Sequence, residues 1–326
     1  MTPRVSVVTP FYNTAPYLAE CIESVLAQSH GDFEYVLVDN HSDDGGGEIA
    51  ARYAARDRRL RIASPPRFVG QVPNYNFALG QIAGDTRYVK MVQADDTIFP
   101  RCLSEMVALA EAHPTIGVVS AYRMFGPEVQ PSGLSHTRTF FTGRDACRLV
   151  LKDGIYLFGS PTTVMFRADL VRGRAPFYAE GRLFEDAEVC FDLLVDHDFG
   201  FVHQVLSFTR TENDSLWSGM RAYNGWLLAR RNQLAQYGRQ FLEPDELDAL
   251  WRARERHYRR FLAEAWLERR DDGFWRFHEK GLATVGDAID RKALVRDAAR
   301  VVVGYAASPR RLGRALLRRV RRDPEP

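Results

Sequence analysis

Residues 33–47 read FEYVLVDNHSDDGGG, and this stretch indicates the class of the fold. Its first seven residues are a mostly apolar run that is typical of a buried β-strand. The run ends at Asp39, and the polar, glycine-rich residues 40–47 predict a turn into a helix that continues through Ala55. Strand, turn and helix in immediate succession form the repeating unit of a sheet that is covered by helices.

Strand and helix patterns alternate on both sides of this stretch. Strands are predicted over residues 5–9, 60–63, 86–93 and 117–122, and helices over residues 17–28 and 98–113, with another helix ending at residue 82. Short connections between them predict an α/β fold with a mostly parallel sheet, and ligands of such sheets bind beyond the carboxyl ends of the strands. The polar residues predicted to lie at those ends are Asn13, Asp39, Asp43, Asp95 and Asp96.

The rest of the chain predicts a second part of different character. Residues 126–215 combine loops with short strands and helices, and from about residue 222 the pattern is helical. We therefore expect one domain over residues 1–218 and a helical extension over residues 219–326. The four cysteines lie far apart without metal-binding spacing, which favours buried thiols in a reduced, cytoplasmic protein. Neither a signal peptide nor a transmembrane helix is expected.

Charge is distributed unevenly along the chain. Residues 291–326 carry eleven Arg and Lys against three Asp and Glu, a net charge of +8, which leaves −6 for residues 1–290 of a chain whose total is +2. Leu312, Leu316 and Val320 recur every four residues among the last arginines. This pattern predicts a basic amphipathic helix, which either lies on an anionic membrane or packs on the protein with its arginines in water. The tail lacks interleaved aromatic residues, so no nucleic-acid partner is expected.

Two groups of acidic residues directly follow predicted strands. Asp95 and Asp96 suit Mg²⁺ or Mn²⁺, because one or two carboxylates hold such an ion while it offsets the charge of a departing nucleoside diphosphate. The alternative is structural, with Asp96 as the N-cap of the following helix. Asp39, Ser42 and Asp43 either accept hydrogen bonds from a nucleobase or ribose, or simply form a turn.

Glu185 and Asp186 form a further acidic pair, with Glu188 close by. An acceptor hydroxyl that attacks an anomeric carbon needs a positioned base, which typically contributes about 10²–10⁴ in rate. Crowded carboxylates raise one another's pKa, which strengthens such a base. The alternative is a solvated, acidic first turn of a helix, which the helix dipole favours.

The order and spacing of these motifs resemble those of the family 2 glycosyltransferases, which have the GT-A fold. The resemblance covers roughly residues 4–215. Residues 5–13 (VSVVTPFYN) are similar to the opening strand and PxYN turn of the family, and residues 36–45 (VLVDNHSDDG) to its VDDxSxDG segment. Residues 70–76 (GQVPNYN), with Gly84-Asp85, are similar to the stretch before its metal motif. Asp95-Asp96 stand at the metal motif and Glu185-Asp186 at the ED motif.

The resemblance implies a GT-A domain with a C-terminal helical extension, in which residues 1–125 bind the nucleotide sugar and residues 126–218 the acceptor. The implied donor-binding residues are Thr9, Pro10, Tyr12, Asn13, Asp39, Ser42, Asp43, Asn74, Asn76, Asp95 and Asp96. Asp95 and Asp96 would hold Mg²⁺ or Mn²⁺, and Asp186, with Glu185 beside it, would be the general base of an inverting, single-displacement transfer. Gly159, Ser160 and Trp217 are expected to border the acceptor, because hydroxyls and aromatic faces suit sugars.

Two positions depart from the family pattern. The metal motif of the family often reads DxDD, whereas Gln93 stands here in place of the first carboxylate. The family often shows an RxH element near the end of the domain, whereas Arg210-Thr-Glu212 has Glu at the His position. Weaker metal binding, or more reliance on the phosphates, is the expected consequence.

We therefore predict a hexosyltransferase-type enzyme that transfers a sugar, with inversion, from a nucleotide-diphosphate sugar to a hydroxyl of a glycan or glycolipid. Bacterial surface polysaccharide or glycolipid synthesis is the setting that the resemblance implies, at the inner face of the cell membrane if the tail binds there. A sugar-nucleotide nucleotidyltransferase would need a basic, glycine-rich loop after the first strand, which residues 11–17 (FYNTAPY) do not provide. The other alternative, an inactive sugar-nucleotide-binding relative, is disfavoured by the retained Glu185-Asp186.

Overall fold

The computed structural model describes residues 4–211 and 222–306. The chain divides into two compact units, residues 1–217 and residues 218–326. All strands of the described residues belong to the first unit, and the second unit is helical where it is described. No helix within the two described ranges is both long and apolar enough to cross a membrane.

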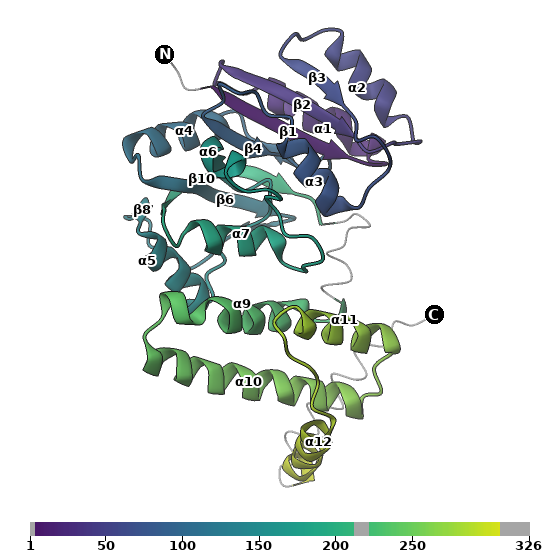
Figure 1. The fold of residues 1–326 in the computed structure, drawn as a ribbon, viewed down its shortest axis with the longest axis vertical. Helices are drawn as coiled ribbons and strands as arrows, with labels where there is room; N and C mark the ends of the chain where they lie inside the picture. The colour runs from purple at the N-terminus through teal and green to yellow at the C-terminus, as the bar shows by residue number, and fades with distance from the viewer. Residues whose placement is uncertain (1–3, 212–221, 307–326) are drawn as a thin grey trace. The chain divides into compact units, whose positions relative to one another are not determined.

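The first unit is built on one ten-stranded sheet (Figure 1). Its strands are β1 Val5–Phe11, β2 Phe33–Asp39, β3 Leu60–Ala63, β4 Tyr88–Met91, β5 Thr97–Ile98, β6 Ile116–Phe125, β7 Glu128–Gln130, β8 Phe140–Phe141, β9 Met165–Arg167 and β10 Asp198–Thr209. The strand order is β3-β2-β1-β4-β9-β6-β10-β5, with β7 paired to β6 and β8 paired to β10.

The sheet is mixed, and its parallel strands set the direction of the site. β1 is parallel to β2 and β4, and β2 is parallel to β3. β6 and β10 are parallel to each other, and the short β9 runs antiparallel between β4 and β6. The carboxyl ends of β1, β2, β4, β6 and β10 therefore lie along one edge of the sheet.

Helices flank this sheet (Figure 1). They are α1 Ala15–Leu26, α2 Gly46–Ala54, α3 Gln71–Leu79, α4 Cys102–Ala112, α5 Gly143–Arg148, the π-helical turn η1 Leu149–Asp153, α6 Ala168–Arg172 and α7 Glu185–Leu193. β1 is buried along its whole length, as expected for a strand covered on both faces. Val7 and Leu37 pack in one core with Leu18 and Ile22 of α1, and all four cysteines are buried with free thiols.

The helix predicted over residues 98–113 begins later than expected. Thr97 and Ile98 form β5, which pairs antiparallel with β10, and the backbone N–H of Phe99 donates to Leu206 O. α4 therefore begins at Cys102, and its N-cap is Arg101. The structural alternative for Asp96, that it caps this helix, is wrong because the sheet takes up the residues that follow it.

The second unit consists of α9 Gly225–Phe241, α10 Pro244–Leu267, α11 Asp272–Ala283 and α12 Arg291–Ala306. A buried guanidinium, that of Arg231 in α9, pairs with Glu255 of α10 at 2.7 Å. The hydroxyl of Tyr258 in α10 lies 2.9 Å from Nδ1 of His278 in α11. The amphipathic helix predicted over the basic tail falls in residues 307–326, outside the described residues.

Candidate active site

The edge formed by the carboxyl ends of the parallel strands collects most of the predicted site residues. The loop after β1 is joined there to the loop after β2 by reciprocal hydrogen bonds: Asn13 Nδ2 donates to Asp43 Oδ1 at 2.8 Å, and Asp43 N donates to Asn13 Oδ1 at 3.0 Å. Asn13 N also donates to Ser42 Oγ, and Ser42 N donates to Asp39 Oδ1 at 2.9 Å. Asn13, Asp39, Ser42 and Asp43 thus form one hydrogen-bonded group.

An exposed aromatic pair lies at this edge. The rings of Tyr12 and Phe68 are 4.8 Å apart, and the two side chains are 45% and 56% exposed. The loop that carries Phe68 is fixed to the end of β2, because Asn40 Nδ2 donates to Val69 O and Val69 N donates to Asn40 Oδ1. Large exposed aromatic faces on a held loop suit stacking with a planar ligand.

Four of the predicted donor-binding residues are buried or half-buried. Thr9 and Pro10 are buried in β1, and Thr9 Oγ1 accepts a hydrogen bond from the Tyr35 hydroxyl at 3.0 Å. Asn74 is buried in α3. The amide of Asn76 makes two hydrogen bonds to the backbone of Tyr178, at 2.8 and 2.9 Å, and so ties α3 to the segment before α7.

Asp95 and Asp96 follow β4 and are attached to the end of β10. Asp96 is buried, and its carboxylate accepts hydrogen bonds from Arg210 N at 3.1 Å and, weakly, from Thr209 Oγ1 at 3.5 Å. Arg210 Nε donates to the carbonyl oxygen of Asp95 at 3.2 Å. Burial, with the charge of Asp95 second, raises the pKa of Asp96 to about 7. Asp95 is half-buried whereas Asp96 is buried, so the Asp95 carboxylate is the more accessible of the two.

The segment between η1 and β9 is fixed beneath the end of β4. The fully buried Lys90 donates from Nζ to the backbone oxygens of Thr162 and Val164, and Gln93 N donates to Thr162 Oγ1 at 3.0 Å. Gly159 has φ +65°, and a Cβ there would meet the Thr163 side chain at 2.4 Å, so only glycine fits. Gly159 is buried, Ser160 is half-buried, and Trp217 lies outside the described residues.

Glu185 and Asp186 form the first turn of α7 and are half-buried rather than solvated. Burial, with the charge of Asp186 second, raises the pKa of Glu185 to about 8. Burial also raises the pKa of Asp186, but the hydrogen bond from Ala187 N, 2.8 Å from Oδ1, and the positive charge of Arg123 oppose the rise. Asp186 is therefore better able than Glu185 to stay ionised.

Two buried residues connect the two acidic pairs. The guanidinium of Arg123, in β6, is 4% exposed and interacts electrostatically with both Asp96 and Asp186, while burial lowers its own pKa. Burial raises the pKa of the Tyr75 hydroxyl in α3, and the charges of Asp95 and Glu185 raise it further. The pair after β4 and the pair in α7, ninety residues apart in the sequence, therefore share two electrostatic neighbours.

The ligand chemistry of this site fits a divalent cation. Asp95 and Asp96 are adjacent carboxylates, and that of Asp95 is accessible. Such a pair suits Mg²⁺ or Mn²⁺, which bind one or two carboxylates together with phosphate oxygens. Residues 4–211 and 222–306 contain no group of three or more His, Cys, Asp or Glu side chains arranged to hold a metal.

A family model, described as glycosyl transferase family 2, matches residues 6–173. This match spans the loop after β1, the loop after β2 and the Asp95-Asp96 pair. The chain belongs to the family 2 glycosyltransferases. It is accordingly a transferase enzyme.

Similar proteins agree with this membership. Glycosyltransferase GlyG of Streptococcus pneumoniae serotype 4 is 25% identical over 238 residues, which cover 67% of this chain and 77% of GlyG. TuaG of Bacillus subtilis, named for teichuronic acid biosynthesis, is 37% identical over 94 residues, which are only 29% of this chain and 36% of TuaG.

Solved structures establish the fold. S. aureus TarS in complex with UDP-GlcNAc has a TM-score of 0.64 at 17% identity, covering 86% of this glycosyltransferase and 80% of the TarS chain. The mannosyltransferase PcManGT from Pyrobaculum calidifontis, in complex with GDP-Man and Mn²⁺, has a TM-score of 0.54 at 20% identity, covering 94% and 81%. The predicted GT-A fold with C-terminal helices is confirmed.

Sequence reasoning missed several residues of the glycosyltransferase site. Arg123 lies inside a strand, where an arginine carries no motif, and Lys90 is likewise one polar residue in an apolar run. Phe68 lies in a loop that also contains Pro65 and Pro66, and no motif marks it as a site residue. Tyr75 falls within the quoted segment at residues 70–76, and its position between the acidic pairs depends on the packing of α3.

Proposed function

We propose that this family 2 glycosyltransferase transfers a sugar from a nucleoside-diphosphate sugar to an acceptor hydroxyl, with inversion at the anomeric carbon. The observation that carries the proposal is that Arg123 interacts electrostatically with Asp96 and Asp186, and Tyr75 with Asp95 and Glu185. Asp95-Asp96 would bind the metal ion at the departing diphosphate, and Glu185-Asp186 would accept the proton of the attacking hydroxyl. A single displacement needs both pairs at the same anomeric carbon.

The proposed donor site runs from the aromatic pair to Asp95. The rings of Tyr12 and Phe68 would stack on the nucleobase, and the hydrogen-bonded group around Asp39 would receive the ribose. Asp95, with Asp96 behind it, would hold Mg²⁺ or Mn²⁺, which offsets the charge of the leaving diphosphate when bound. The complexes of TarS with UDP-GlcNAc and of PcManGT with GDP-Man and Mn²⁺ support a donor of this class.

Asp186 is the proposed general base. The acceptor oxygen bonds to the anomeric carbon while the bond from that carbon to the diphosphate breaks, and the hydroxyl proton passes to Asp186. The charge of Arg123 and the hydrogen bond from Ala187 N favour the ionised form of Asp186, as a base requires. Glu185, whose pKa lies near 8, is proposed to remain neutral beside it. Ser160 is the residue of the held 158–164 segment proposed to border the acceptor.

The proposed setting is the synthesis of a bacterial surface polysaccharide or glycolipid. The support is the name of TuaG, which refers to teichuronic acid, a cell-surface polymer. The C-terminal tail, with seven arginines between residues 310 and 322, would hold the enzyme on an anionic membrane where a lipid-linked acceptor is found.

A donor screen tests the reaction. Hydrolysis of UDP-, GDP- and dTDP-sugars is measured with Mg²⁺ or Mn²⁺ for the wild type, for Asp186→Asn and for the control Asp196→Asn, an exposed carboxylate just after α7. We expect metal-dependent release of one nucleoside diphosphate, reduced about 10²-fold or more only in Asp186→Asn. If no donor turns over, calorimetric titration decides, because a transferase that waits for its acceptor still binds its donor. Absence of binding for every donor would contradict the proposal.

A further inference from the structure

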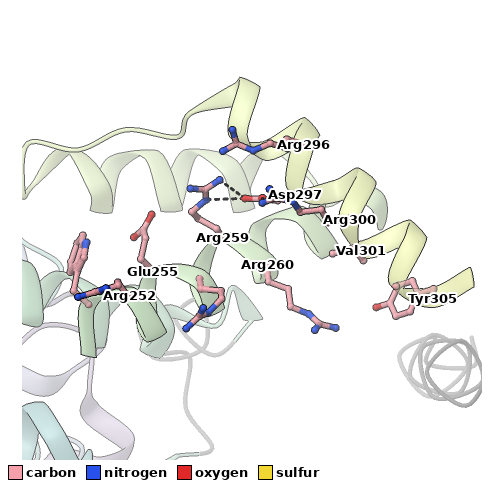
Figure 2. Close-up of a pocket in the computed structure, with 12 residues that line it drawn as sticks. Arg252, Glu255, Arg259, Arg260, Arg296, Asp297, Arg300, Val301 and Tyr305 are labelled. Atoms are coloured by element: carbon pink, nitrogen blue, oxygen red, sulfur yellow. Dashed lines mark hydrogen bonds and ion pairs between the residues drawn. The ribbon is translucent and has the colours of Figure 1, made fainter. Parts of the chain in front are cut away.

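The helical unit contains a strongly basic cavity of its own, between α10 and α12 (Figure 2). Its volume is about 600 Å³. Two of its lining residues are acidic, Glu255 and Asp297, and six are arginines: Arg252, Arg256, Arg259, Arg260, Arg296 and Arg300. We refer to the cavity lined by these six arginines as the arginine groove.

The acidic residues of the groove are already engaged in ion pairs. Asp297 lies 2.6 Å from Arg259 and 3.1 Å from Arg300. Glu255 pairs with Arg231, which does not line the groove, at 2.7 Å. Neither carboxylate therefore remains to balance the other arginines, and the lining as a whole carries an excess of positive charge.

Arg252 and Arg260 form ion pairs within α10, with Asp248 at 3.6 Å and Glu264 at 2.9 Å, which leaves Arg256 and Arg296 as the two unbalanced arginines of the groove. Both side chains are exposed, and neither makes an ion pair with a carboxylate of the described residues. One comes from α10 and the other from α12. Each of these guanidinium groups suits a phosphate, because the planar donor fork of arginine matches phosphate oxygens.

α12 exposes apolar side chains beside this groove, and the first of them, Val295, also lines a separate cavity with Trp266 and Trp275. Val295, Val302 and Val303 are 54%, 51% and 66% exposed, and their spacing of seven and eight residues places them on one face of the helix. Exposed Ala299 lies between them on the same face. An exposed apolar face bordered by cations is the pattern of a helix that lies in a membrane interface.

We propose that the arginine groove binds the phosphate groups of anionic phospholipids while the valine face of α12 enters the membrane interface. The groove supplies positive charge and room for a headgroup, and the valines supply the apolar contact that a soluble phosphate would not need. The proposal concerns the helical unit alone and does not depend on the transfer reaction.

Vesicle sedimentation of the full chain tests this proposal. Binding is compared between vesicles of phosphatidylcholine alone and vesicles that also contain phosphatidylglycerol. We expect selective binding to the latter, weakened about tenfold or more in Arg256→Ala/Arg296→Ala, since each basic residue near an anionic surface contributes appreciably to affinity. Val302→Ser/Val303→Ser should also weaken binding, although it leaves the charge unchanged.

The matched control is Arg239→Ala/Lys280→Ala, which removes the same charge from exposed positions of α9 and α11 outside the groove. Equal losses in the two charge variants would overturn the proposal, because they would show attraction by net charge alone. Wild-type binding that does not depend on phosphatidylglycerol would overturn it as well. Binding of inorganic pyrophosphate through Arg256 and Arg296, without vesicle binding, would replace the lipid by a soluble phosphate. Unchanged donor hydrolysis separates a failure here from a failure of the proposed reaction.

Discussion

The side-chain amide of Gln93 donates a hydrogen bond to the hydroxyl of Tyr75 across 2.9 Å. Gln71, in the first turn of α3, donates to the same hydroxyl at 2.6 Å. Gln93 occupies the position at which family 2 enzymes often have the first carboxylate of the metal motif. In this enzyme a neutral amide held by α3 thus stands where a negative charge often faces the diphosphate.

Gln93→Glu should strengthen the response to metal. Glutamate keeps the length of the side chain, lets Tyr75 donate the hydrogen bond instead, and adds a carboxylate next to Asp95. Because hard cations gain affinity from each added carboxylate, we expect the Mn²⁺ concentration for half-maximal activity to fall severalfold. Metal titration of donor hydrolysis measures it, and Gln240→Glu, at an exposed position of α9, is the control that adds the same charge elsewhere. An unchanged metal requirement would place the cation elsewhere.

Arg123→Met should shift the pH dependence of the reaction. The cation favours the ionised forms of Asp96 and Asp186, so its loss raises the pKa of both carboxyls. A base acts only when it is deprotonated, and the acid limb of the pH–rate profile should therefore move to higher pH by about one unit. Arg123→Lys keeps the positive charge, so the acid limb of its pH–rate profile should stay close to that of the wild type. A loss of rate at all pH values, without a shift, would make Arg123 only structural.

Glu188→Gln should change stability in a pH-dependent way. Burial raises the pKa of Glu188 to about 7, and its ion pair with Arg182 at 3.4 Å only partly opposes this. The folded chain binds this proton more tightly than the unfolded chain, so the wild type loses stability as the pH rises toward 7. The variant should be more stable by about 2–3 kcal/mol at pH 8 and nearly equal at pH 4. Urea unfolding at both pH values measures the difference, and a constant offset would contradict it.

Phe68→Ala should weaken nucleotide binding. Stacking of a base on an aromatic side chain is worth about 1–3 kcal/mol, so the Kd of the preferred nucleoside diphosphate should rise about tenfold. Phe99→Ala removes another exposed phenyl ring, 41% exposed, and should leave the Kd unchanged. Calorimetry with the nucleoside diphosphate alone gives both values. Equal Kd values for the two variants would remove Phe68 from the donor site.

The sequence predicted the long strands that precede Asp39 and Asp95 better than the short strands β8 and β9. Asp39 and Asp95 were placed at strand ends because β2 and β4 are apolar runs with abrupt polar ends, and parallel strands bring such ends together. β9 has three residues and β8 has two, too few for any periodicity to appear. Their places depend on pairing with strands distant in the sequence.

The contacts of buried polar residues could not be predicted from the sequence either. The apolar pattern of β6 predicted its strand but gave no reason for Arg123 within it, because the partners of this residue come from other elements. The resemblance assigns Thr9 and Asn76 to the donor site, and it gives no sign that their side chains also hydrogen-bond to Tyr35 and to the backbone of Tyr178. A motif identifies which residue types recur, and only packing decides whether a side chain contacts the ligand or supports one that does.

The reversed direction of β9 has a consequence for substitutions in the segment that precedes it. Because β9 runs against β4 and β6, the segment that precedes it, rather than the one that follows it, emerges at the carboxylate-bearing edge. Lys90 anchors that segment through the backbone oxygens of Thr162 and Val164, and Gln93 N anchors it through Thr162 Oγ1. Between buried neighbours, Ser160 is half-buried at this edge. A substitution at Ser160 therefore changes this edge without altering the register of β4 against β1, because the segment is not itself a strand of the sheet.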